Sequence, residues 1–166
     1  MVKRAMLPQV RLRRQRPGDL GWVVQRHGEL YWDDYGYDLR FEALVAGIVA
    51  RFVENFDARR ERCWIAERGG RRLGAVFVVK QSPRVAKLRL LIVEPEARGL
   101  GLGMRLVRAC VRFARAAGYR KLVLWTQSEL EAARAIYEKA GFRQVRSEAH
   151  RSFGKRLTGE HWELVL

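Results

Sequence analysis

The stretch that decides the fold runs from Leu88 to Val107 and reads LRLLIVEPEARGLGLGMRLV. Its apolar run, Leu90–Val93, has the length and branching that predict a buried strand. Pro95 ends the strand, because proline offers no N–H to a strand ladder. A long helical pattern follows three glycines at alternate positions, Gly99, Gly101 and Gly103. Strand, glycine-rich turn and helix N-terminus together predict an anion site, since unpaired N–H groups and the positive end of the helix dipole converge there.

Two common phosphate-binding motifs do not fit this stretch. A P-loop needs lysine and Ser/Thr after its last glycine, and no lysine follows Gly103. The dinucleotide fingerprint G-x-G-x-x-G needs its third glycine where Met104 stands, and Tyr119–Trp125 offers no acidic residue for a ribose. A turn that only packs a helix closely is another explanation. Three spaced glycines at a helix start are costly, however, unless something must approach the backbone.

Length and composition predict a globular protein. For 166 residues we expect a flexible N-terminal tail, residues 1–9, and a single domain, residues 10–166. The 48% hydrophobic and 31% charged residues are typical of soluble proteins. No apolar run approaches the roughly 20 residues that cross a bilayer. The first ten residues lack the apolar core of a signal peptide, so we expect a cytoplasmic protein that does not associate with membranes.

The remaining composition gives weaker indications. Cys63 and Cys110 fall in apolar patterns and are predicted to be buried, reduced thiols. The three histidines lack ligand spacing, so no metal site is expected. The net charge of +15 would suit nucleic acid, an acidic surface or an anionic cofactor. No DNA-binding motif accompanies the scattered arginines, so direct nucleic-acid binding is kept only as an alternative.

Periodicity and turn residues predict the elements of the first half. Asp19 is placed to cap a helix that ends near Leu30. The aromatic and acidic segment from Tyr31 to Tyr37 is expected to be a connection that serves either recognition or packing. A second amphipathic helix runs from Asp38 to Phe56. The strands that follow or precede these helices are Val10–Arg14, Cys63–Glu67, Leu73–Val79 and Val85–Val93, the last three forming an antiparallel meander.

The second half alternates strands and helices. The helix after the glycines is expected to end near Ala117, and Leu122–Trp125 is predicted to be a strand parallel to the one before the glycines. Ser128 and Glu131 form a capping box that predicts the start of another helix, which ends at Gly141. Two closing strands are predicted, Phe142–Val145 and Trp162–Leu166.

This order of elements and two motifs resemble the GNAT superfamily of N-acetyltransferases. The motifs are R-G-x-G-x-G after a strand that ends Val-x-Pro, and A-R-A-I-Y-E-K-A-G-F at Ala133–Phe142. The resemblance implies an α/β fold with a mixed, mostly antiparallel sheet of about seven strands and about four helices. It also implies a splay between the strand ending at Val93 and the strand Leu122–Trp125. The sequences R-P-G-D at Arg16–Asp19 and S-F-G at Ser152–Gly154 are similar to those of GNAT domains associated with MarR-type regulators.

The resemblance implies acetyl-CoA as cosubstrate. The pantetheine arm would pair with the strand before the glycines, and the pyrophosphate would lie on the N–H groups from Gly99 to Gly103. Relatives often carry an asparagine where Leu130 stands, and Gln127 is the residue that would take its place. The expected cofactor-binding residues are Leu91, Ile92, Val93, Arg98, Gly99, Leu100, Gly101, Leu102, Gly103, Met104, Gln127, Ala133 and Tyr137.

The implied reaction is direct acetyl transfer to a primary amine of a small molecule or a protein. Tyr137 stands at the family's general-acid position, where packing alone is the other explanation. Glu94 is one candidate base, and a water chain, His27 or the Asp33–Asp34 pair are others. A catalytically silent acyl-CoA sensor is the alternative function.

The acceptor side is less well defined by the sequence. Tyr31, Trp32 and Tyr35 are expected to contact the acceptor. The neighbouring carboxylates favour a cationic amine, whereas the overall charge favours an anionic one, and the sequence does not decide. A homodimer could form through the closing strands and the loop around residues 150–156.

Overall fold

The computed structural model describes residues 9–166, so the predicted tail lies outside the described residues except for Gln9. The strands are β1 (Arg11–Arg13), β2 (Arg62–Arg68), β3 (Arg71–Lys80), β4 (Val85–Val93), β5 (Lys121–Gln127), β6 (Arg143–Ser152) and β7 (Lys155–Val165). The helices are α1 (Asp19–Tyr35), α2 (Leu39–Glu54), the short 3-10 helix η1 (Pro95–Ala97), α3 (Leu102–Ala116) and α4 (Glu131–Lys139). None of the helices in this range is long and apolar enough to cross a bilayer.

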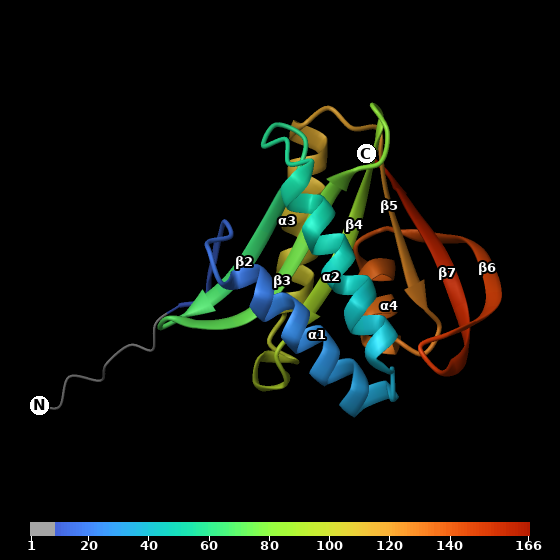
Figure 1. Cartoon of the computed structure of the whole chain (residues 1–166). Coiled ribbons are helices and arrows are strands. Elements are labelled where there is room, and N and C mark those ends of the chain that lie inside the picture. Colours follow the sequence, from blue (N-terminus) through green and yellow to red (C-terminus); the bar gives the residue numbers. More distant parts are fainter. Residues whose placement is uncertain (1–8) are drawn as a thin grey trace, which may run out of the picture.

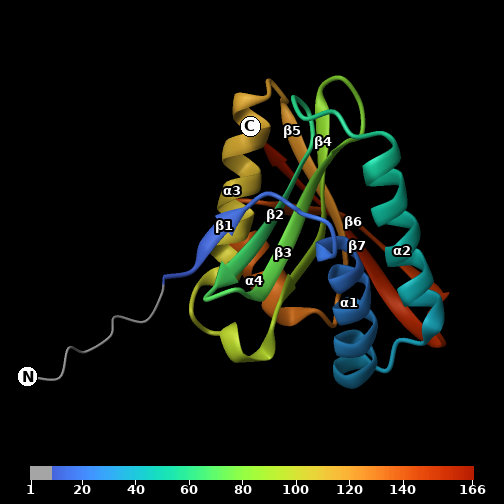
Figure 2. The ribbon, with the colours of Figure 1, turned by 60° about the vertical axis from the view of Figure 1, so that its left-hand side comes forward.

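All seven strands form one sheet in the order β1-β2-β3-β4-β5-β7-β6. Neighbouring strands are antiparallel except β4 and β5, which are parallel. Helices cover both faces of the sheet, with α1 and α2 on one side and α3 and α4 on the other (Figures 1 and 2). The predicted α/β fold with a mostly antiparallel seven-stranded sheet and four helices is therefore confirmed.

Each face of the sheet has its own apolar core. On one face, Val23 of α1, Val45 of α2 and Phe77 of β3 belong to one buried cluster. On the other, Leu106 of α3 and Leu122 of β5 belong to a second. Both cysteines are buried and free, as predicted. Because apolar cores cover both faces of the central strands, a ligand can reach the middle of the fold where two strands separate.

That separation lies between β4 and β5. Their parallel ladder covers only three residue pairs, Val85–Lys87 with Lys121–Val123. Beyond it the predicted splay opens, and the edge of β4 that faces β5 has no ladder partner within the described residues. Leu90 marks the start of this free edge, with a φ of 55° at an irregularity in the β3–β4 register. Positive φ is unfavourable for leucine, so the surrounding packing must hold this bulge in place.

Two helix starts differ from the sequence predictions. Helix α1 begins at Asp19 with Gly18 as its N-cap, and it continues to Tyr35, so most of the predicted aromatic connection is helical. Helix α4 begins at Glu131 after Leu130, and no side chain caps it, so the Ser128–Glu131 capping box was wrong. The closing strands are also longer than predicted, because β6 and β7 form one hairpin that pairs along most of its length.

Asp19 instead fixes the start of α1 to the sheet. Its carboxylate is fully buried and accepts from Arg13 Nη1 at 2.7 Å, Arg72 Nε at 2.7 Å and the Arg16 N–H at 2.6 Å. Burial alone would raise the pKa of Asp19, but these hydrogen bonds outweigh it and lower the pKa to about 2. One carboxylate thus joins β1, β3 and α1.

Asp19→Asn should therefore lower the free energy of unfolding by about 2 kcal/mol at neutral pH, because it removes the buried charge to which Arg13 and Arg72 donate hydrogen bonds. Urea denaturation measures this loss, with the exposed Asp33→Asn as matched control. The pKa of Asp19 is lower folded than unfolded, so its contribution is present above about pH 4 and disappears as the pH falls towards about 2. Unfolding free energies of the wild type and Asp19→Asn should converge over that range. Curves that stay parallel would contradict this assignment.

Candidate functional site

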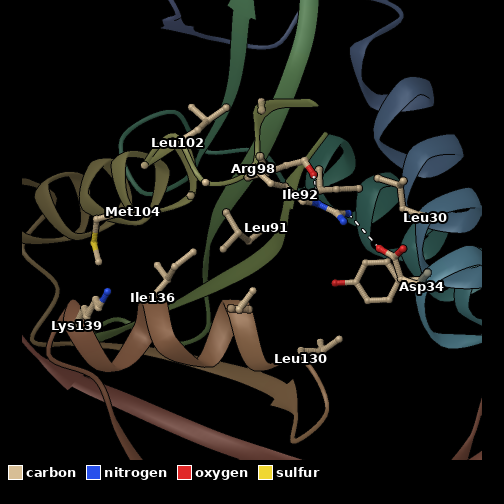
Figure 3. A pocket seen from close by; sticks show the side chains of 18 of the residues that line it. Leu30, Asp34, Leu91, Ile92, Arg98, Leu102, Met104, Leu130, Ile136 and Lys139 are labelled. Atoms are coloured by element: carbon tan, nitrogen blue, oxygen red, sulfur yellow. Dashed lines mark hydrogen bonds and ion pairs between the residues drawn. The ribbon is translucent and has the colours of Figure 1, made fainter. Parts of the chain in front are cut away.

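A cavity of about 420 Å³, here called the donor cavity, lies between β4, α3, α4 and the C-terminal half of α1. Leu91, Met104 and Ile136 point into it from β4, α3 and α4, respectively (Figure 3). The free edge of β4 forms its floor through Leu91, Ile92 and Val93. A long, narrow ligand could thus pair with strand backbone while apolar side chains enclose it.

The glycine-rich turn forms one end of the donor cavity. Gly99 and Gly101 have φ values of 76° and 77°, which glycine adopts without strain. Gly101 is the N-cap of α3 and provides no side-chain cap, so the first N–H groups of the helix, on Leu102, Gly103 and Met104, are left for a ligand. This geometry suits a phosphate group, since amides and helix dipole point the same way.

Gly103 has a different reason to be glycine. A Cβ at this position would lie 2.6 Å from Cδ1 of Ile136, well inside van der Waals contact. The third glycine therefore lets α3 approach α4. Close helix packing, which the sequence offered as the alternative to phosphate access, thus explains Gly103 but not the positive φ of Gly99 and Gly101.

Charged side chains also line the donor cavity. Arg98 Nη2 donates to Asp34 Oδ2 at 3.1 Å, and Arg98 Nε donates to the Val93 carbonyl at 3.3 Å (Figure 3). Lys139, at the end of α4, supplies a second cation to the lining. Arg98 thus lines the donor cavity and is paired with Asp34 of α1, a contact that the sequence did not predict.

A second, smaller cavity of about 110 Å³ lies on the α1–α2 side of the splay, and we call it the acceptor cavity. Four residues line both cavities: Tyr31, Leu91, Leu130 and Ala133. The two cavities therefore meet beside the bulge of β4. A reacting group held in one can face a reacting group held in the other.

Tyr137 lies on α4 and lines the acceptor cavity rather than the donor cavity. Its side chain is buried, and its hydroxyl makes no hydrogen bond within the described residues. Burial, with a smaller contribution from Tyr31, raises the pKa of Tyr137 well above its usual value. The phenol is therefore neutral at physiological pH and keeps its proton as a donor.

His27 of α1 is the buried imidazole of the acceptor cavity. Its side chain is 1% exposed, and Nδ1 lies 2.8 Å from the Val23 carbonyl, so Nδ1 carries the proton. Nε2 is buried and has no hydrogen-bond partner in residues 9–166. Burial lowers the pKa of His27 to about 4, which the bond to Val23 only partly offsets. The lone pair of Nε2 is thus free to accept a hydrogen bond.

Glu94 lines neither cavity, which argues against its predicted role as base. Its carboxylate accepts two hydrogen bonds from Arg26, at 2.6 and 2.8 Å. A two-point ion pair of this kind holds α1 against the end of β4 and ties up both carboxylate oxygens. The structure therefore places Glu94 as a positioning residue.

Most predicted cofactor-binding residues line the donor cavity, and the exceptions have clear causes. Leu100 is 70% exposed on the outside of the turn. Gln127 lies in the acceptor cavity, where its amide oxygen accepts from His150 Nε2 at 2.8 Å. Of the predicted acceptor contacts, Tyr31 and Tyr35 line cavities, but Trp32 is 62% exposed and lines neither. The prediction missed several lining residues, namely Leu30, Asp34, Ala97, Leu130, Ala132, Ile136 and Lys139.

The tip of the β6–β7 hairpin closes the far side of the acceptor cavity. Phe153, with a φ of 56°, stacks on Tyr37 at a centroid distance of 5.2 Å. Its carbonyl accepts from the Asp38 N–H at 3.1 Å, and Lys155 Nζ donates to the Tyr35 carbonyl at 2.7 Å. The loop that the sequence offered as a dimer contact therefore packs against its own chain.

Comparison with known proteins agrees with this geometry. The family model described as "Acetyltransferase (GNAT) family" matches residues 20–142. An uncharacterized N-acetyltransferase of Schizosaccharomyces pombe is 30% identical over 122 residues, which cover 72% of this chain and 74% of the relative. N-acetyltransferase family 8 member 2 of Rattus norvegicus is 37% identical over 101 residues, covering 58% of this chain and 44% of the relative. The mycothiol acetyltransferase of Amycolatopsis mediterranei is 30% identical, covering 62% and 38%.

Solved structures share the fold at low sequence identity. The yncA protein of Salmonella typhimurium, described with its cofactor acetyl-CoA, gives a TM-score of 0.77 at 16% identity over 95% of this chain and 94% of that one. A ribosomal-protein-alanine N-acetyltransferase from Brucella melitensis gives 0.76 at 19% identity over 94% and 99%. The chain spans less than half the length of the rat and Amycolatopsis relatives. The family-model match nevertheless covers most of the described fold, and the chain belongs to the acetyltransferase (GNAT) family.

Proposed function

We propose that this protein is an acetyl-CoA-dependent N-acetyltransferase that acts on a primary amine. One observation carries the proposal: the donor cavity joins an unpaired strand edge to the uncapped N-terminus of α3. The edge would hold the pantetheine arm, and the free amides with Arg98 and Lys139 would hold the pyrophosphate. The solved yncA structure with acetyl-CoA has the same fold and supports this assignment.

The chemistry would take place where the two cavities meet. Bound acetyl-CoA would supply an acetyl thioester, which can pass its acetyl group to an unprotonated amine. Backbone N–H groups on the free edge of β4 can donate to the oxygen on which negative charge develops. The Tyr137 hydroxyl holds a proton that it can give to the leaving sulfur. His27 Nε2 can accept a hydrogen bond from the amine and so orient it, a role that we assign in place of Glu94.

Three predictions about the setting in which the protein works stay proposals. A cytoplasmic location, a homodimer and a MarR-type regulator acting alongside the protein rest on sequence alone.

The proposed function is tested by calorimetry with acetyl-CoA and by thiol release in the presence of an amine panel. Binding of acetyl-CoA with release of thiol that depends on an amine supports the enzyme. Binding without amine-dependent release would identify the sensor alternative instead. Absence of any binding heat with acetyl-CoA or CoA would overturn both.

Tyr137→Phe should lower the rate of acetyl transfer by about 100-fold or more, because it removes the proton donor and leaves the ring in place. The dissociation constant for acetyl-CoA should change little. Tyr119→Phe is a matched control, since Tyr119 is a buried tyrosine that donates to the Arg60 carbonyl and lines neither cavity. A turnover number that is unaltered in Tyr137→Phe would rule out the acid role.

Asp34→Asn should tighten binding of CoA by about two- to fivefold at low salt, because it frees Arg98 and removes a negative charge from the phosphate end. The gain should shrink as salt is raised, since both side chains are partly exposed. Calorimetry measures the change, and Asp33→Asn controls for the loss of a carboxylate that lines neither cavity. Weaker binding in Asp34→Asn would show that the ion pair shapes the cavity rather than competing with the ligand.

A further inference from the structure

Two cations of β4 face the acceptor cavity. Lys87 and Arg89 alternate along the strand with Ala86 and Leu88, which are buried in the core under α3. Strand alternation therefore places Lys87 and Arg89 on the α1–α2 face, and both line the acceptor cavity. Each side chain is half-buried.

Neither cation has an anionic partner. Within residues 9–166 no carboxylate lies in salt-bridge distance of Lys87 or Arg89, and no Asp or Glu lines the acceptor cavity. The carboxylates near the aromatic residues have other positions: Asp34 pairs with Arg98, Asp38 pairs with Arg40 at 2.6 Å, and Asp33 is exposed. The acidic segment that favoured a cationic acceptor in the sequence thus places no carboxylate in the lining of this cavity.

The half-buried, unpaired positions of Lys87 and Arg89 lower the pKa of both side chains. Burial, and then repulsion from Arg89, lowers the pKa of Lys87. Burial, and then repulsion from Arg51, lowers the pKa of Arg89. Two like charges that are partly removed from water raise the free energy of the cavity, and a bound anion would recover that free energy.

The other lining residues and the volume of the acceptor cavity limit the size and polarity of its ligand. Tyr31, Tyr37 and Phe41 present aromatic rings, and His27 is neutral near pH 7. The cavity volume of about 110 Å³ leaves space for a small molecule only. Hydrogen-bonding groups from Tyr137 and His27 lie in the same lining, where the amine must reach the donor cavity.

We propose that the acceptor is a small amine that carries a carboxylate, of the class of α-amino acids with apolar side chains. Lys87 and Arg89 bind the carboxylate, the aromatic wall contacts the side chain, and the amine lies towards Leu91 at the junction of the two cavities. This inference rests on the proposed function and names its substrate class. A polyamine would bring positive charge to an already cationic cavity, which Coulomb repulsion disfavours.

The first test compares matched acceptors by thiol release with acetyl-CoA: L-leucine, L-methionine and L-phenylalanine, their amides, and spermidine. The amide of an amino acid has the less basic amine, so chemistry alone would make the amide react faster near neutral pH. We expect the acids to have a kcat/KM about tenfold or more above their amides, because only the acids pair with the two cations. Spermidine should be the poorest substrate.

The second test uses charge-removing variants. Lys87→Gln and Arg89→Gln should each raise KM for the preferred amino acid about tenfold or more and leave kcat/KM for its amide within about twofold. Arg112→Gln is the matched control, because Arg112 is exposed on the outer side of α3 and lines neither cavity. An unchanged dissociation constant for CoA shows that each variant is folded.

A binding readout completes the design. N-acetyl-L-leucine should bind the CoA-loaded protein by calorimetry, whereas N-acetyl-L-leucinamide should bind at least about tenfold more weakly. Equal use of acids and amides, preference for spermidine, or turnover of the amides with no turnover of any acid would overturn the substrate class alone. Failure of acetyl-CoA to bind would instead overturn the proposed function beneath it.

Discussion

The short parallel ladder between β4 and β5 is the constraint on which the rest of the structure depends. Three residue pairs hold the strands together, and beyond Lys87 and Val123 they separate. A longer ladder would satisfy the backbone of β4 and leave no groups for a ligand. A shorter one would detach β5, β6 and β7 from the rest of the sheet, because β4–β5 is the only link between the two parts in the described strand order. The strands are thus paired at one end of this ladder and leave a free edge of β4 at the other.

The two cavities use different parts of the protein. On the donor side, the groups that we propose for recognition are mostly backbone: the edge of β4, the turn glycines and the N-terminus of α3. Such groups suit a cosubstrate whose phosphates and amide-containing arm match backbone hydrogen bonding. On the acceptor side, side chains from five elements and the hairpin tip form the lining. Substitution can alter these side chains without disturbing the backbone. One fold can therefore keep the same acetyl donor while its specificity for the acceptor amine changes.

Local sequence signals predicted the elements that surround the donor cavity. The bounds of β4, Val85–Val93, follow from an apolar run between Pro83 and Pro95, and the glycine motif marks the start of α3. Ile136 and Lys139 were missed although they follow Ala132 and Ala133 at helical spacing, because a helix period does not say which ligand its face meets. Gly103 shows the same limit, since its need for space comes from Ile136, thirty-three positions later in the chain.

The acceptor side could not be predicted because it depends on contacts that are distant in sequence. His27 was only one of several candidates for the base until its environment showed an unpartnered Nε2. Glu94 had a suitable chemical type, but Arg26 of α1 occupies both of its oxygens. Tyr31 to Tyr35 continue α1 rather than forming a loop, which places Tyr31 inside and Trp32 outside. In each case a contact or the helix geometry determined the surroundings of the side chain, which its residue type alone did not predict.

The position of Phe153 has a consequence for the order in which the site is completed during synthesis. Every residue that lines the donor cavity has left the ribosome once Lys139 has emerged. The acceptor cavity still lacks its last wall at that point, because Phe153 reaches Tyr37 only when the final hairpin has folded back across the α1–α2 junction. A nascent chain therefore has every lining residue of the donor cavity outside the ribosome before it has the wall that closes the acceptor cavity.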